Sequence, residues 1–162
     1  MKADEAGIVI SGRRWSASDF VRADGTPGPW TSQALEADPL SFEAELGRFL
    51  TEFFSHGAAV TVHTSGSTGA PKAFAAEKSR MRASARATIA FLGLKPGCTN
   101  LLAMPLRFIA GKMVVVRSAE CGLNLIPVEP CANPFLEHRE AADLCALTPM
   151  QAATVLANPA TS

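Results

Sequence analysis

The sequence predicts an α/β fold in which a parallel sheet built from βαβ units is covered by helices. Two observations carry this prediction. Short apolar runs of strand length alternate with longer segments whose apolar residues recur at three- and four-residue steps. Connections of this length favour right-handed crossovers between parallel strands. The 162 residues suffice for one buried core, and we divide them into an N-terminal piece of hairpin and short helices, 1–38, and a partial α/β domain, 39–162.

The N-terminal piece begins with a predicted hairpin. Ile8–Ile10 and Arg13–Trp15 are strand-like runs, and the glycine between them suits a tight turn. Ser16 and Asp19 form a pair typical of a helix start. A cluster of Gly, Pro and Asp over residues 24–29 then interrupts the pattern and separates this piece from the rest.

From residue 39 onward helices and strands alternate. The predicted helices cover 41–56, 78–92, 109–119, 134–138 and 149–156, and the predicted strands cover 58–62, 73–76, 101–104, 123–126 and 143–147. On the second helix, Lys78, Arg82 and Arg86 form a basic stripe. This stripe would face either cofactor phosphates or solvent, and a charged helix face is usually solvated.

The overall composition excludes several classes of partner. The formal net charge is zero, so nothing in the balance predicts binding to nucleic acid or to a membrane. The first residues lack a basic region followed by an apolar core, and no apolar run is long enough to span a bilayer. We therefore expect a cytoplasmic location. The cysteines lack metal-ligand spacing, and we expect reduced thiols rather than disulfides at Cys98, Cys121, Cys131 and Cys145.

Residues 64–72 form a run rich in hydroxyls and glycine, Thr-Ser-Gly-Ser-Thr-Gly-Ala-Pro-Lys. Glycines let successive N–H groups turn toward one anion, hydroxyls add donors, and the lysine adds a cation. The spacing excludes a Walker loop and a dinucleotide fingerprint. A surface linker without chemistry is the alternative, but the strand-like runs on both sides favour a phosphate loop.

This run resembles, residue for residue, the Thr-Ser-Gly-Ser/Thr-Thr-Gly-x-Pro-Lys signature of the adenylate-forming superfamily, which includes acyl-CoA synthetases. The resemblance implies the N-terminal part of that family's large domain, with ATP, Mg²⁺ and CoA as cofactors. It implies that a carboxylate attacks ATP to give an acyl-adenylate, from which a thiol displaces AMP. It assigns catalysis to Lys72 and nucleotide binding to Thr64, Ser65, Gly66, Ser67, Thr68, Gly69 and Lys72.

The segment 102–113 resembles the superfamily's second landmark, which forms part of the acyl pocket. Arg107-Phe108 stands where the commonest version has Phe-His, so no role of that histidine carries over. Together with residues 78–85 and 133–135, the segment is similar to the o-succinylbenzoate–CoA ligases of menaquinone biosynthesis. That branch implies a dicarboxylate substrate, whose second carboxylate would pair with Arg107, Lys112 or Arg117. The substrate-binding residues it implies are Arg107, Phe108, Gly111 and Lys112.

The resemblance covers only the beginning of the family's pattern. Members carry, further along, a Tyr-Gly-x-Thr-Glu segment for adenine and Mg²⁺, a ribose-binding Asp and a C-terminal lobe, whereas this sequence has no tyrosine. We therefore expect an N-terminal part that is inactive alone. The alternatives are a non-catalytic nucleotide- or phosphate-binding module and a structural or interaction domain with a vestigial loop. An open sheet edge would favour self-association, or pairing with a chain that supplies the missing part.

Overall fold

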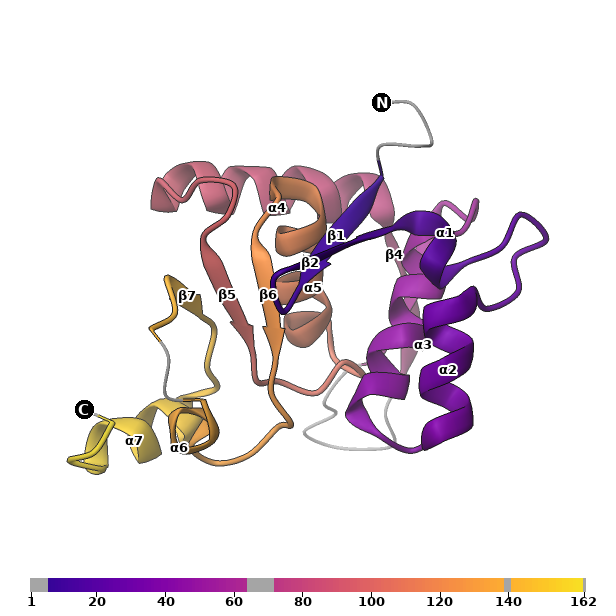
Figure 1. The fold of residues 1–162 in the computed structure, drawn as a ribbon. Helices are drawn as coiled ribbons and strands as arrows, with labels where there is room; N and C mark the ends of the chain where they lie inside the picture. Colours follow the sequence, from indigo (N-terminus) through magenta and orange to yellow (C-terminus); the bar gives the residue numbers. More distant parts are fainter. Residues whose placement is uncertain (1–5, 64–71, 139–140, 162) are drawn as a thin grey trace.

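A computed structural model describes residues 6–63, 72–138 and 141–161. Within these ranges the chain forms a five-stranded sheet, a separate two-stranded sheet and the helices packed on them (Figure 1). The larger sheet has the strand order β2-β1-β6-β5-β7. Its strands are β1 (Gly7–Ile10), β2 (Arg13–Ser16), β5 (Thr99–Leu102), β6 (Asn124–Pro127) and β7 (Leu144–Cys145).

Four strands of the larger sheet, β1, β6, β5 and β7, run parallel, which confirms the predicted parallel α/β sheet. β2 adds an antiparallel edge through the predicted hairpin with β1. In the middle of the sheet Leu101 pairs with Ile126 on one side and with Cys145 on the other. Leu101, Leu102 and Leu125 are fully buried, so the centre of the sheet is apolar.

Except for α2, for which there is no separate prediction, the helices begin and end near their predicted positions. They are α1 (Ala17–Phe20), α2 (Pro29–Ala37), α3 (Phe42–Phe54), α4 (Lys78–Leu92), α5 (Ile109–Cys121), α6 (Pro134–Glu137) and α7 (Pro149–Ala157). The Ala44 N–H donates to Ser41 Oγ at the start of α3. Gly93 and Gly122 end α4 and α5 in the left-handed conformation, each with φ of 68°. α3 ends at Phe54 with Ser55 as its cap, so the predicted stop at Gly57 is wrong.

The remaining strands, β3 (Ala59–His63) and β4 (Ala73–Glu77), form an antiparallel hairpin that is a sheet of its own, and an isolated parallel bridge joins His63 to Phe108. The prediction that the strand before the signature belongs to the parallel sheet is therefore wrong. β3 is also half-buried rather than fully buried, because Val60 and Val62 face the core while Thr61 and His63 are exposed. Such alternation suits a two-stranded sheet with one face on the core.

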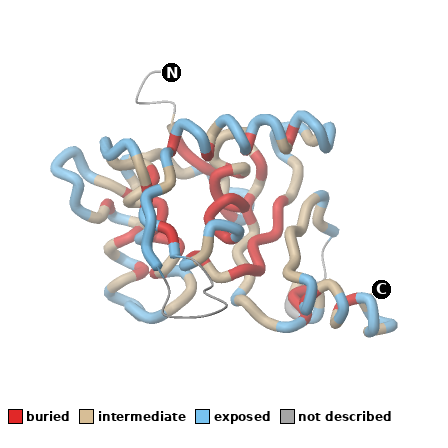
Figure 2. The backbone as a smooth tube through the Cα atoms, turned by 180° about the vertical axis from the view of Figure 1, so that it is seen from behind, coloured by how far each residue is buried: buried red, intermediate tan, exposed pale blue. Residues whose placement is uncertain are grey.

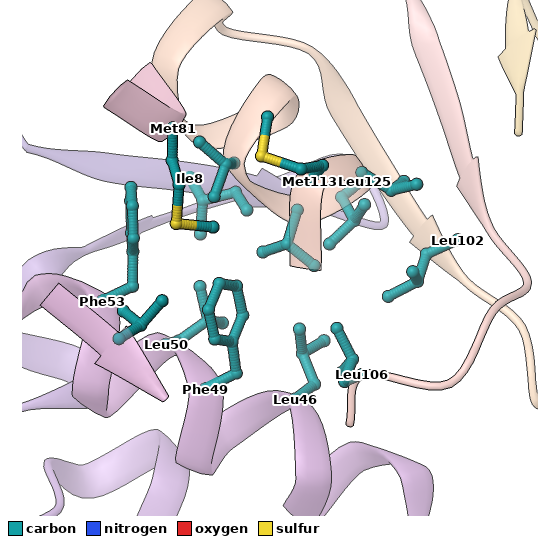
Figure 3. Packing of buried hydrophobic residues seen from close by; sticks show 14 of the residues in the cluster. Ile8, Leu46, Phe49, Leu50, Phe53, Met81, Leu102, Leu106, Met113 and Leu125 are labelled. Atoms are coloured by element: carbon teal, nitrogen blue, oxygen red, sulfur yellow. The ribbon is translucent and has the colours of Figure 1, made fainter. Parts of the chain in front are cut away.

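One hydrophobic core joins the larger sheet, α3, α4 and α5. α5 contacts β1, β5 and β6 and also packs against α4. Figure 3 shows side chains of α3, among them Leu46, Phe49 and Phe53, pointing toward Met113 of α5 and the sheet. Figure 2 shows the buried residues gathered in the middle of the molecule and exposed residues on the outer turns of the helices. Because α3 and α5 pack into the same core, they give rigid support to the side chains that lie between the two helices.

The N-terminal piece is built into the same body. β1 pairs with β6, and α2 packs against α3, although the division at residue 38 itself stays a prediction. β7 is an edge strand with no outer partner among the described residues, and self-association through that edge also stays a prediction. No helix within the described ranges is long and apolar enough to cross a membrane.

Candidate functional site

Most of the predicted nucleotide-binding run lies outside the described residues. This applies to Thr64, Ser65, Gly66, Ser67, Thr68 and Gly69, whose assignment stays a prediction. The described flanks are His63, the last residue of β3, and Lys72, which directly precedes β4 and is exposed. Because His63 pairs with Ala73, the two ends of the run come together at one end of the hairpin.

A pocket of about 250 Å³ opens beside His63. Its walls come from α3, from β3 and from the segment that joins β5 to α5. The lining residues are Glu45, Arg48, Phe49, Glu52, Thr61, His63, Leu106, Arg107 and Lys112. Two of the four predicted substrate-binding residues, Arg107 and Lys112, therefore lie in one pocket with the residue that precedes the signature. The lining contains both signs of charge, so it suits a small polar or anionic group.

Arg107 presents its side chain at the rim of this pocket. It is exposed, and its guanidinium carbon lies 4.6 Å from the ring centroid of Phe108, which caps the N-terminus of α5. The main chain here is tied to the hairpin, because the His63 N–H donates to the Arg107 carbonyl oxygen at 3.3 Å. Arg107 can therefore meet a ligand from a fixed backbone position.

Gly111 has a packing role in the structure. A Cβ atom at this position would lie 2.4 Å from the Pro105 carbonyl oxygen and 2.9 Å from that of Met104. Only glycine allows the first turn of α5 to approach the end of the β5 segment this closely. The predicted contact between Gly111 and a substrate stays a prediction.

Lys112 points inward rather than toward solvent. Its side chain is 9% exposed, and Nζ donates to the Thr61 carbonyl oxygen at 2.7 Å. The Glu52 carboxylate lies 3.8 Å away, and the Phe49 ring centroid lies 4.7 Å away. Burial lowers the pKa of the Lys112 ammonium below its ordinary value, and Glu52 partly opposes this effect. Lys112 is thus engaged with protein groups, unlike the exposed side chain of Arg107.

Arg117 does not line the pocket. It lies further along α5, where burial lowers the pKa of its guanidinium. Its Nε is buried and has no hydrogen-bond partner among the described residues. Of the three predicted partners for a second carboxylate, Arg107 and Lys112 are brought to the pocket and Arg117 is not.

The basic stripe of α4 has neither of its two predicted roles. Lys78 is buried, and its Nζ donates to the Ser55 carbonyl oxygen at 2.8 Å. Arg82 donates to the Glu120 carboxylate of α5 at 2.6 Å, and Arg86 pairs with the other oxygen of that carboxylate. The stripe therefore links α4 to α3 and α5, which corrects the expectation of a solvated or phosphate-facing surface.

Glu52 is one of the pocket residues that sequence reasoning missed. It lies on the amphipathic helix α3 three positions after the buried Phe49 and one before the buried Phe53. A carboxylate beside the apolar face of a helix is a usable signal, but its partner cannot be named from the sequence. The four cysteines are free and half-buried, and the described residues contain no group of three or more His, Cys, Asp or Glu side chains that could hold a metal ion.

No protein-family model matches the chain, and no curated protein matches it. Among solved structures, the chain is similar to an acyl-CoA synthetase (AMP-forming)/AMP-acid ligase II-like protein from Dyadobacter fermentans. The two are 35% identical with a TM-score of 0.70, over 76% of this chain and 35% of that one. This chain therefore spans about a third of the length of that protein.

Two weaker similarities to solved structures are also found. The N-terminal domain of FACL13 from Mycobacterium tuberculosis is 25% identical with a TM-score of 0.40, over 44% of this chain and 18% of that one. The NpsA N-terminal subdomain from Klebsiella oxytoca is 15% identical with a TM-score of 0.43, over 79% and 50%. These two scores are too low to carry an argument. The similarity to the Dyadobacter protein supports the adenylate-forming superfamily, and the α/β fold described here matches the N-terminal domain of adenylate-forming enzymes.

Proposed function

We propose that the chain is the N-terminal part of an ATP-dependent acyl-CoA ligase, which activates a carboxylate as acyl-AMP and transfers the acyl group to CoA. The observation that carries this proposal is the nine-residue signature at 64–72, in a chain whose fold matches that family's N-terminal domain. The pocket beside His63, with Arg107 at its rim, supports it further.

The chemistry asks the signature to hold negative charge. When a carboxylate attacks the α-phosphorus of ATP, the leaving pyrophosphate gains charge. Lys72 would hold the β- and γ-phosphates together with the Ser and Thr hydroxyls and the N–H groups of the run. In such ligases bound Mg²⁺ neutralises phosphate charge. Since the described residues offer no cluster for a metal ion, we assign Mg²⁺ to none of them.

For the acid we propose o-succinylbenzoate, which has two carboxylates, and we give the carboxylate that is not activated to Arg107. Arg107 is exposed at the pocket, whereas the Nζ of Lys112 already bonds to Thr61. A guanidinium can bind a carboxylate through two parallel hydrogen bonds. The ring of Phe108 lies against this guanidinium and would help to hold it at the rim of the pocket.

Calorimetry on the full chain tests both halves of the proposal. The first titration adds ATP to the wild-type protein and to Lys72→Met, and it tests nucleotide binding. We expect wild type to bind and Lys72→Met to bind about tenfold more weakly, because a charge-assisted contact is lost. Both proteins should remain folded, which thermal melts check. Lys95→Met, a substitution of another exposed lysine, is the matched control. Absence of ATP binding by wild type would favour a domain with a vestigial loop.

In the second half, o-succinylbenzoate is titrated into wild type and into Arg107→Gln. We expect about tenfold weaker binding by Arg107→Gln, from the loss of a charged hydrogen-bond pair. Arg22→Gln, at an exposed arginine outside the pocket, should bind as wild type does. If Arg107→Gln and wild type bound o-succinylbenzoate equally well, Arg107 would not be part of the acid-binding site. The conclusion from the ATP titration would not change.

A further inference from the structure

The side of β3 that faces away from β4 is occupied by charged side chains. The Thr61 N–H donates to Glu52 Oε1 at 2.7 Å, and Lys112 Nζ donates to the Thr61 carbonyl oxygen at 2.7 Å. In a wider sheet a third strand would supply this acceptor and this donor. Here two side chains take its place. We call Glu52, Thr61 and Lys112 the Thr61 clamp.

The clamp joins three elements that are separated in the sequence. Glu52 lies on α3, Thr61 in the middle of β3 and Lys112 in the first turn of α5. Glu52 Oε2 and Lys112 Nζ are 3.8 Å apart, with side-chain exposures of 35% and 9%. Charged hydrogen bonds in such partly buried positions are stronger than those on an open surface. The clamp therefore fastens β3 to the two helices that share the core.

The clamp acts close to the signature. Thr61 pairs with Ala75, and His63 pairs with Ala73, which follows Lys72 directly. The His63 N–H bonds in turn to the Arg107 carbonyl oxygen. The position of Lys72 relative to the pocket thus depends on where the hairpin sits against α3 and α5, and the clamp sets that position.

We propose that Glu52 and Lys112 are positioning residues, which act through Thr61 to hold the hairpin where Lys72 can meet the phosphates of a polyphosphate ligand beside the pocket. This inference rests on the proposed function. Both side chains also line the pocket, but in this role they act through the main chain of Thr61 and not by contact with the polyphosphate. Without the clamp the hairpin would occupy several positions, and binding would be weakened because only a fraction of the molecules would be competent.

The test compares variants of the full chain for tripolyphosphate affinity by calorimetry and for amide hydrogen exchange. Lys112→Met and Glu52→Ala each remove one side of the clamp, and Lys112→Arg keeps the donor and the charge. We expect the first two to bind tripolyphosphate about tenfold more weakly and to exchange the Thr61 amide about tenfold faster. Lys112→Arg should restore most of both. Glu120→Gln, which breaks a charged contact between α4 and α5 away from the clamp, controls for a general loss of stability.

The outcomes separate the clamp from the proposed function. Weaker binding in Glu120→Gln equal to that in Lys112→Met would overturn the positioning role, as would faster Thr61 exchange with unchanged affinity. If wild type binds no tripolyphosphate, the proposed function fails. Hydrogen exchange of the Thr61 amide is then the measurement that tests whether the clamp holds the hairpin. Faster Thr61 exchange in Glu52→Ala and Lys112→Met would then support the clamp, and unchanged exchange would overturn it.

Discussion

The two sheets of the molecule are held in different ways. β6 lies between two strands, β1 and β5, and its main chain pairs with both, while Leu125 is fully buried. β3 has β4 on one side, and on the other side Glu52 and Lys112 bond to Thr61. β4 is mostly exposed, with Phe74 at 44%. Apolar burial thus holds the scaffold, whereas the hairpin that flanks the signature is held by two buried valines, Val60 and Val62, and by charged side chains.

The largest effect should come from the scaffold. Leu101→Ala removes a fully buried side chain from the middle of β5. We expect the free energy of unfolding to fall by about 2–5 kcal/mol, because the lost burial and the cavity add together. Urea unfolding followed by circular dichroism measures this.

Leu40→Ala is the control for that substitution, since Leu40 is 92% exposed. Its effect should stay within about 0.5 kcal/mol. A cost below about 1 kcal/mol for Leu101→Ala would break the comparison, because the sheet would then not depend on apolar burial.

A smaller effect should follow when the charged contacts between α4 and α5 are broken. Glu120→Gln leaves Arg82 and Arg86 of α4, the helix that follows β4, without their carboxylate. We expect a loss of about 1–2 kcal/mol, as for hydrogen bonds to charged groups, and a smaller difference from wild type in high salt. Thermal melts at two salt concentrations measure both.

Glu77→Gln makes the same chemical change in the exposed pair with Arg80, where the side chains are 55% and 83% exposed. It should cost less than about 0.5 kcal/mol. If Glu120→Gln and Glu77→Gln lost equal stability, the contacts of Glu120 would contribute no more than an ordinary surface ion pair. Charged contacts could then not be what stabilises this part of the molecule.

The effect that is smallest at neutral pH concerns the edge of the larger sheet, and it develops only in alkaline solution. Burial raises the pKa of the Cys145 thiol on β7 from 9.0 to about 11. Between these values the folded state keeps a proton that the unfolded state loses, so the free energy of unfolding should fall as the pH rises through this window. Cys145→Ala should lack this component.

Alkylation by iodoacetamide, followed by mass spectrometry, checks the same group directly. Only the thiolate reacts, so the rate at Cys145 should keep rising until the pH reaches about 11. An alkylation rate that levels off near pH 9 would mean that β7 opens locally and exposes Cys145. The larger sheet would then be less stable at this edge than the comparison with the hairpin assumes.

Local signals predicted most of the elements. Periodic apolar residues located α3 and α4, Gly93 marked the end of α4, and α5 ends two residues beyond its predicted end at residue 119. α2 received no separate prediction, because the Gly- and Pro-rich cluster before it reads as a loop, although Pro29 suits a first helical position. Elements with strong periodicity or a specific cap are thus readable from the chain alone.

Contacts between distant residues could not be predicted. Arg82 lies 38 positions from Glu120, and Lys112 lies 51 positions from Thr61. A single sequence does not show that the residues of either pair are in contact. The α4 stripe was therefore interpreted as a solvated face, and Lys112 as a substrate ligand. Arg107 could be singled out by resemblance, but its position at the rim and the inward direction of Lys112 depend on how α5 packs against the hairpin.

The Thr61 clamp has a further consequence for the molecule in solution. An uncovered strand edge with free N–H and C=O groups is a template on which a second molecule can add a strand, and proteins block such edges with charged side chains. Glu52 and Lys112 occupy both main-chain groups of Thr61 on the open side of β3, beside the apolar Val60 and Val62. The contacts that hold the hairpin in place therefore also block this edge of β3 against the addition of a strand from a second molecule.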